Sequence, residues 1–217
     1  MNKIPMHFSQ SFELLSIEIF FTLIIIFSSL VIFYKTKDLY KLSNHRGIHF
    51  FRLGFFFIGI SHIISLGILL FRTFLIKYFS FSSIIYLFRI NDLFFLIGII
   101  FLFSSMYSKK IKSHYIYLVA FGIFLLTLII NSRLLFFFFT SISVILLGCI
   151  SIYKLKTTKK KSFSSIYLIY MLIFISWLLA LLSNILDIFP RGKTINVITL
   201  GCALLYILII VERKLVK

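Results

Sequence analysis

Six strongly polar side chains interrupt segments that are otherwise apolar, and these are the residues best suited to chemistry. They are Glu18, His62, Arg89, Asp92, Asn184 and Asp187. A charged group inside a bilayer costs roughly 2.5–3.5 kcal/mol on insertion scales, so it is retained for a partner or for a ligand. Counted at about 1.5 Å per residue along each helix, all six fall toward the same side of the membrane. We therefore expect them to line one polar pocket for a small polar ligand, an ion or a proton.

Arg89 and Asp92 are three residues apart, so they share one face of a helix. Two interpretations remain open. The charges could neutralise one another and fix the packing of the helices, or they could bind a ligand. In both cases Arg89 and Asp92 are expected to face the interior of the bundle, with Glu18 or His62 in contact.

A second group, His45, His49 and Arg52, recurs at spacings of four and three and therefore forms one stripe on a helix. Ser43 or Asn44 can cap the start of that helix. Two histidines one turn apart could begin a metal site, but no carboxylate accompanies them, so no metal is expected. An anionic lipid headgroup is the expected contact of this stripe.

Motifs of known enzymes and cofactor sites do not occur. The chain has no glycine-rich phosphate loop, no His-Glu-x-x-His, no Gly-x-Ser-x-Gly and no paired aspartates. Residues 195–211 contain no lysine for a retinal Schiff base, and the Pro-Gln pairs of seven-helix sugar transporters are absent. No cofactor and no catalytic residue are therefore expected, and a non-enzymatic function is favoured.

The elements that must position these residues are membrane-spanning helices. Of the 217 residues 61% are hydrophobic and only 13% are charged, against about a quarter charged in soluble domains. This composition excludes a soluble or a disordered protein. Seven apolar runs approach the roughly 20 residues that cross a bilayer: Phe12–Tyr34, Gly47–Phe71, Ile84–Tyr107, Tyr115–Asn131, Leu134–Tyr153, Ile166–Phe189 and Ile195–Val211.

The third run is the least regular, because Arg89, Asn91 and Asp92 lie inside it. Leu93–Met106 is too short to span alone, so the helix must extend back through these residues, although Thr73–Phe88 could instead lie along the interface. We predict an all-α integral membrane protein, a seven-transmembrane helix bundle in which residues 1–217 form a single membrane domain.

The basic residues predict the orientation. Of the 23 Lys and Arg residues, 15 fall in segments on one side of the membrane and six on the other. The positive-inside rule places the richer side in the cytoplasm, with the amino terminus outside and the carboxyl terminus inside. The net charge of +17 is expected to meet anionic lipid in a multi-pass protein of the cell membrane, and no nucleic acid.

In this orientation the six polar residues of the pocket lie in the outer half of the bundle. The cytoplasmic half offers mainly Phe, Ile and Leu, with small residues such as Gly148 that permit close helix contact. We expect the pocket to open outward and the cytoplasmic half to pack dry.

One segment carries a resemblance to a known family. Leu39–Ile63, which includes Ser43-Asn44-His45-Arg46-Gly47, resembles the cytoplasmic loop and second helix of small seven-helix membrane proteins of archaea. The resemblance implies the seven-helix fold, and it implies no activity and no catalytic residue.

Three functions are compatible with these features. The first is a sensory or receptor-like protein whose outer pocket changes helix packing at the cytoplasmic face and signals through a cytoplasmic or membrane partner. The second is a small secondary transporter or proton-coupled carrier, which needs a continuous polar path. The third is a membrane enzyme that acts on lipid headgroups near His45, His49 and Arg52.

Overall fold

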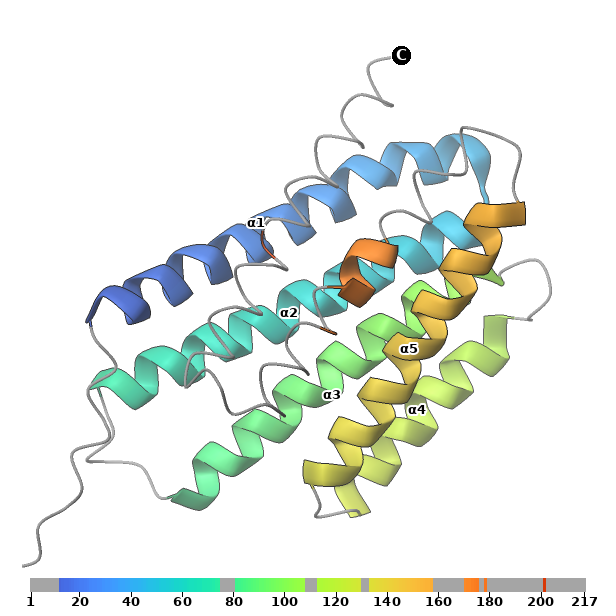
Figure 1. Cartoon of the computed structure of the whole chain (residues 1–217). Coiled ribbons are helices and arrows are strands. Elements are labelled where there is room, and N and C mark those ends of the chain that lie inside the picture. Colours follow the sequence, from blue (N-terminus) through green and yellow to red (C-terminus); the bar gives the residue numbers. More distant parts are fainter. Residues whose placement is uncertain are drawn as a thin grey trace, which may run out of the picture.

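The computed structural model describes residues 12–74, 81–107, 113–129, 133–157 and 170–175, together with residues 178 and 201. Within these residues the chain forms five long helices and no strand (Figure 1). The helices are α1 (Phe12–Ser43), α2 (Arg46–Phe74), α3 (Phe81–Met106), α4 (Ser113–Ile129) and α5 (Arg133–Thr157).

Helices α1 to α4 lie side by side in the order of the sequence, and α5 packs on α3 (Figure 1). Neighbours in this row run in opposite directions, so each end of the bundle collects residues from every helix. We call the end that carries Lys35, Lys37, Lys41 and Arg46 the basic end, and the opposite one the far end. Residues 170–175 form a further helical turn beside α5 (Figure 1).

Three described helices are long and apolar enough to cross a membrane: Leu15–Ser43, Arg46–Phe71 and Tyr86–Met106. A shorter apolar helix covers Ser141–Tyr153. Their outer faces are apolar as well, since Phe20 and Phe27 of α1 are 60% and 66% exposed. Exposed apolar faces of this kind are unfavourable in water and favourable in lipid, so the described part of the chain is an all-helical structure of membrane type.

Helix α1 continues nine residues past Tyr34, the predicted end of the first span, to Ser43. Leu39 and Leu42 are good helix formers, and they continue the helix through a segment that is otherwise polar and mostly exposed. The helix ends at Asn44, which has a φ of 45° and whose N–H donates to the carbonyl oxygen of Tyr40 at 2.8 Å. Asparagine tolerates this left-handed conformation at a helix C-terminus better than most residues.

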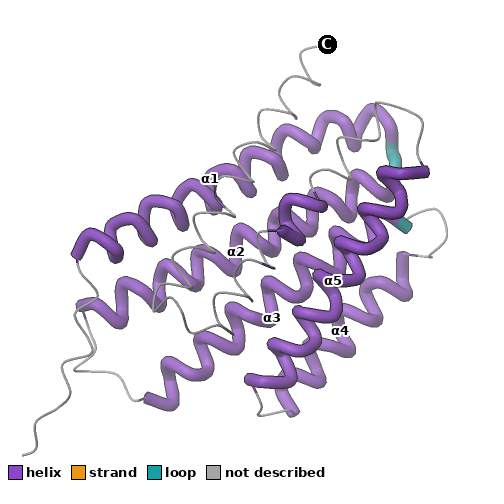
Figure 2. The backbone as a smooth tube through the Cα atoms, in the orientation of Figure 1, coloured by secondary structure: helices purple, strands orange, loops and turns teal. Residues whose placement is uncertain are grey.

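Helix α2 begins two residues later, after the short connection coloured teal in Figure 2. The side chain that caps it is His45, because its Nδ1 accepts a hydrogen bond from the N–H of Gly47 at 3.1 Å. The prediction that Ser43 or Asn44 caps α2 is therefore wrong. The hydroxyl of Ser43 instead donates to the carbonyl oxygen of Leu39 in the last turn of α1, and Asn44 terminates α1.

Helix α3 is continuous from Phe81 to Met106 and includes Arg89, Asn91 and Asp92. This confirms that the third apolar run extends back through its polar residues. In a bilayer, a backbone N–H or C=O group without a hydrogen bond costs several kcal/mol of free energy. A membrane helix therefore stays continuous even where polar side chains occur in it. The predicted sixth and seventh spans lie mostly outside the described residues.

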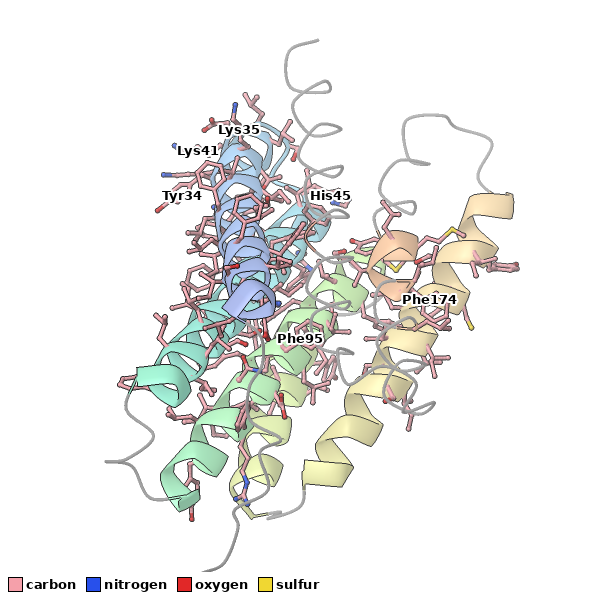
Figure 3. All side chains as sticks on the ribbon, turned by 60° about the vertical axis from the view of Figure 1, so that its left-hand side comes forward. Tyr34, Lys35, Lys41, His45, Phe95 and Phe174 are labelled. Carbon is pink, nitrogen blue, oxygen red and sulfur yellow. The ribbon has the colours of Figure 1, made fainter. Side chains whose placement is uncertain are left out.

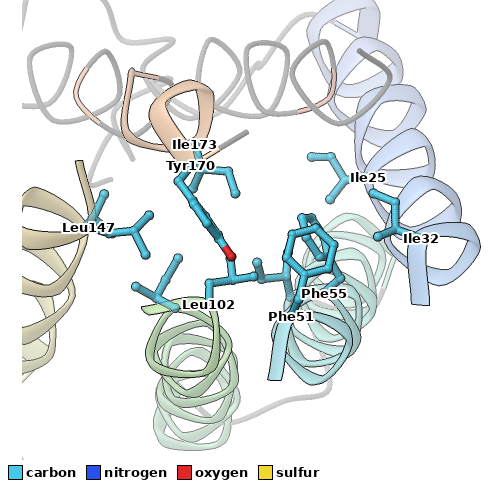
Figure 4. Packing of buried hydrophobic residues seen from close by; sticks show 11 residues of the cluster. Ile25, Ile32, Phe51, Phe55, Leu102, Leu147, Tyr170 and Ile173 are labelled. Atoms are coloured by element: carbon cyan, nitrogen blue, oxygen red, sulfur yellow. The ribbon is translucent and has the colours of Figure 1, made fainter. Parts of the chain in front are cut away.

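The core is an apolar cluster enclosed by α1, α2, α3, α5 and the turn at residues 170–175 (Figure 4). Its buried members are Ile25, Ile32, Phe51, Phe55, Ile58, Ile99, Leu102, Val144, Leu147, Tyr170 and Ile173. A second cluster joins α2, α3 and α4 through Phe50, Leu93, Leu96, Ile97, Phe101 and Ile116. The two clusters lie on different faces of α3, which is therefore the central helix of the described part.

Two glycines bring α2 and α3 into close contact. A Cβ atom on Gly98 would lie 2.9 Å from Cγ1 of Ile58 and 3.0 Å from the carbonyl oxygen of Gly54. A Cβ atom on Gly54 would lie 2.6 Å from Cδ2 of Leu102. Small residues at such crossings let helix backbones approach one another, which is how helices associate in lipid. Gly148 of α5 likewise leaves room for the ring of Phe174, as expected from the sequence.

Candidate functional site

Glu18 lies on the inward stripe of α1, near the far end. The residues that follow it at spacings of four and three are buried: Thr22, Ile25, Ser29, Ile32 and Thr36. Glu18 itself is half-buried, and its carbonyl oxygen accepts a hydrogen bond from the hydroxyl of Thr22 at 2.7 Å. Because residues at this spacing share one helix face, the carboxyl group stands at the far end of the stripe that packs into the core.

His62 lies on α2 where this helix meets α3. Its Nδ1 donates to the carbonyl oxygen of Ile58 at 2.9 Å, and its ring lies edge-on to Phe95 of α3 at 6.3 Å. Since Nδ1 carries the hydrogen in this bond, Nε2 is the acceptor of a neutral ring. Nε2 has no hydrogen-bond partner among the described residues.

Arg89 and Asp92 occupy the first half of α3, and both are half-buried. Asp92 is seven residues before Ile99, so it lies on the face of α3 that enters the central cluster. Its Oδ1 accepts a hydrogen bond from the side-chain amide of Asn91 at 3.3 Å. The guanidinium carbon of Arg89 lies 5.3 Å from the ring centre of Tyr86, a cation–π geometry that accommodates a charge near apolar surroundings.

The structure thus places Glu18, His62 and Asp92 on inward or helix-contacting faces of three successive helices, with Glu18 near the far end of α1 and with His62 and Asp92 near the middle of α2 and α3. Asn184 and Asp187, the other two members of the predicted pocket, lie outside the described residues. In the part of the chain that is described, no three His, Cys, Asp or Glu side chains are grouped closely enough to hold a metal ion.

At the basic end Arg52 joins α2 to α1. Its Nε donates to the carbonyl oxygen of Phe33 at 3.2 Å. Its guanidinium carbon lies 4.8 Å from the ring centre of Phe33 and 5.8 Å from that of Tyr40. The two terminal nitrogens of Arg52 have no hydrogen-bond partner in the described ranges, so the guanidinium is held by its stem and keeps its charged donors available.

His49 joins the same helices to α4. Its Nε2 and the hydroxyl of Tyr117 are 3.2 Å apart and share a hydrogen bond. Its ring centre lies 5.2 Å from that of Tyr40. His49 and Arg52 therefore both contact Tyr40, as expected for neighbours on one stripe, whereas His45 is exposed and uses its Nδ1 as the cap of α2.

Buried hydroxyl groups occur in the half of the bundle that was expected to be almost purely apolar. Thr36, Ser104 and Ser151 each donate to the backbone carbonyl four residues earlier. The hydroxyls of Ser105 and Tyr170 bond to each other across 65 residues of sequence. That expectation needs correction, because serine and threonine can be buried at low cost when the helix itself accepts their hydrogen bonds.

Sequence reasoning missed Phe33, Tyr40 and Tyr117, the partners of Arg52 and His49. It also missed the bond between Ser105 and Tyr170, which involves no predicted residue. The spacing of Phe33 and Tyr40 could have been used, because residues seven apart share a helix face and can contact the same side chain. Tyr117 and Tyr170 offer no such spacing, since their partners are far away in sequence.

No family model, no curated protein and no solved structure matches this chain.

Proposed function

We propose that the protein is a seven-helix membrane receptor or sensor, with its amino terminus outside and its carboxyl terminus in the cytoplasm. Its ligand would be a small polar molecule, an ion or a proton that binds among Glu18, His62, Arg89, Asp92, Asn184 and Asp187. The 15 to six distribution of basic residues supports this orientation. In it, the far end faces outward and the basic end faces the cytoplasm.

The observation that carries the proposal is the continuity between polar residues and core faces. Glu18 begins the α1 stripe that contains Ile25 and Ile32. Asp92 lies on the same face of α3 as Ile99, and Leu102 follows Ile99 by three residues on that face. A change of charge or contact at Glu18 or Asp92 therefore acts on side chains that meet in the central cluster.

The same cluster reaches the basic end through Tyr170, which is 1% exposed and bonded to Ser105 in the last turn of α3. Packed cores tend to switch between discrete arrangements rather than deform continuously. Repacking at Ile99 would therefore alter the contact between α3 and the turn at residues 170–175. That surface would be read by a cytoplasmic or membrane partner.

Hydrogen exchange in lipid nanodiscs tests this proposal. Acidification from about pH 8 to about pH 5 spans the range in which histidines and perturbed carboxyls change charge, and Na⁺ and K⁺ can be added as separate probes. We expect one of these changes to alter exchange in Leu102–Tyr107 in the wild type and not in Asp92→Asn. Exchange that responds identically in both proteins would contradict the proposal.

One observation favours the transporter instead. The hydroxyls of Ser28 and Ser29 are buried and have no hydrogen-bond partner within the described ranges. They lie on α1 between Glu18 and the basic end, where a polar path would have to run. Ion flux into proteoliposomes, driven by a gradient and abolished in Ser29→Ala, would favour a carrier, whereas a receptor is expected to give no flux.

A further inference from the structure

At the basic end, two residues of α2 join this helix to its neighbours. Arg52 contacts Tyr40 of α1, and His49 contacts Tyr40 and bonds to Tyr117 of α4. We call these four residues, together with Lys37 of α1, the Arg52 cluster.

Lys37 of α1 adds a second cation to the Arg52 cluster. It lies between Phe33 and Tyr40 at spacings of four and three, so it shares the face of α1 that borders Arg52. Lys37 is exposed. Asp38, the acid of this part of α1, follows Lys37 by one residue and therefore points about 100° away around the helix. The Arg52 cluster is thus positive, with no carboxylate on the same face of α1.

The two terminal nitrogens of Arg52 remain available among the described residues. Arg52 uses Nε on the carbonyl of Phe33 and stacks against two rings, which orients its two terminal nitrogens without occupying them. A guanidinium with paired N–H donors fits the oxygens of a phosphate. Tyrosine hydroxyls and a lysine ammonium are common additional donors to such an anion.

The position suits a lipid. Large exposed aromatic side chains mark this end of the helices: Tyr34, Tyr115 and Tyr153 are 65%, 54% and 68% exposed. Tyrosines gather where headgroups begin. Farther along α2, on the face of Arg52, follow the half-buried Phe56 and the exposed Ile63. An acyl chain would run along these apolar residues toward the middle of the bilayer.

We propose that the Arg52 cluster, formed by Lys37, Tyr40, His49, Arg52 and Tyr117, binds the phosphate of an anionic phospholipid. The structure changes the membership of the predicted stripe. His45 is not a member, because its Nδ1 caps α2, whereas residues of α1 and α4 are members. Other basic side chains at this end, among them Lys35 and Lys41 (Figure 3), are not members of the Arg52 cluster and contribute only to the general attraction of anionic lipid.

The test uses the full-length protein, purified and delipidated in a neutral detergent. Phosphatidylglycerol is titrated in, and bound lipid is counted by native mass spectrometry while Tm is followed in parallel. Lys37→Gln is expected to weaken phosphatidylglycerol binding by about fivefold, the usual effect of one basic residue near an anionic lipid. Arg52→Lys keeps the charge but loses the paired donors, and it is expected to weaken binding by a similar factor.

The matched control is Lys35→Gln, which removes the same charge from α1 two residues earlier, on a different face. It is expected to change the affinity by less than about twofold, as a general charge effect would. An equal loss in Lys35→Gln and Lys37→Gln would overturn the site in favour of a diffuse basic surface. Binding of phosphatidylcholine as tight as that of phosphatidylglycerol would overturn the anionic requirement. Displacement of the lipid by millimolar inorganic phosphate would show that the Arg52 cluster binds a soluble anion instead.

Discussion

At the scale of single residues, the described core encloses hydroxyl groups rather than charges. Thr22, Thr36, Ser104 and Ser151 are buried, and each bonds to a carbonyl of its own helix. Tyr170 differs, because its hydroxyl bonds to another segment of the chain. Hydrogen bonds between helices in lipid are worth about 0.6 kcal/mol on average and up to about 1.7 kcal/mol. The bond of Tyr170 to Ser105 is therefore a modest but specific link between α3 and the turn at residues 170–175.

Tyr170→Phe tests this link. The substitution removes the hydroxyl but keeps the ring, which packs edge-on against Phe51 at 6.2 Å. We expect a loss of about 0.5–1.5 kcal/mol in the free energy of unfolding, measured by denaturant titration in detergent micelles.

The control for this prediction is a double-mutant cycle with Ser105→Ala. If the two hydroxyls stabilise the protein through each other, the double variant loses no more than the larger single loss. Additive losses would mean that each hydroxyl acts through other groups.

At the scale of elements, α2 and α3 form the tightest pair because glycine lies on both sides of their contact. Gly98 faces the carbonyl oxygen of Gly54, and Leu102 fills the space beside it. Rings of Phe57 of α2 and Phe101 of α3 stack at 5.4 Å next to this contact. Van der Waals packing drives helix association where lipid is as apolar as the side chains, so this contact is a main source of stability in the described bundle.

Gly98→Ala is expected to destabilise the protein by about 1–3 kcal/mol, because its Cβ meets backbone atoms of α2 that cannot yield without separating the helices. Gly67→Ala is the matched control on α2, since nothing lies within 4 Å of a Cβ at that position. There alanine is expected to be neutral or to stabilise by up to about 1 kcal/mol through its higher helix propensity. Thermal unfolding of both variants in the same detergent distinguishes them. Equal effects would indicate that α2 and α3 do not approach as closely as described.

At the scale of the whole molecule, the two ends of the bundle differ in chemistry. The basic end carries cations and exposed tyrosines. Glu18 lies near the far end, and His62, Arg89 and Asp92 lie between the far end and the middle of α2 and α3. This difference would let the protein bind a different class of ligand on each side of the membrane. A polar ligand would bind on the side of the far end, and an anionic lipid would bind at the basic end. The two proposals rest on separate residues, so the failure of one leaves the other standing.

Reporter fusions test the proposed orientation. A fusion after Asn44, between α1 and α2, and one after Thr157, the last residue of α5, are both expected to report a cytoplasmic location, because basic residues surround both positions. A fusion after Lys77 is expected to report an external location. An external reading at Thr157 would contradict both the orientation and the number of spans before it.

The sequence by itself predicted the helical character of the chain and most of the helix positions in the described part. Helices follow from local composition, since an apolar run in lipid must satisfy its own backbone. This reasoning extended the third run correctly through Asp92 into α3. It placed the end of the first run too early, because a helix does not have to stop where the bilayer does, and α1 continues to Asn44.

Contacts between helices were decided by the tertiary structure alone. Arg52 reaches the carbonyl of Phe33, nineteen residues away, and His49 reaches Tyr117, sixty-eight residues away. No periodicity links such residues, because a helical repeat identifies which side chains share a face and not which face of another helix they meet. Spacing in the sequence could therefore propose His45, His49 and Arg52 as one stripe. Only the tertiary structure showed that His45 caps α2, whereas His49 and Arg52 contact residues of α1 and α4.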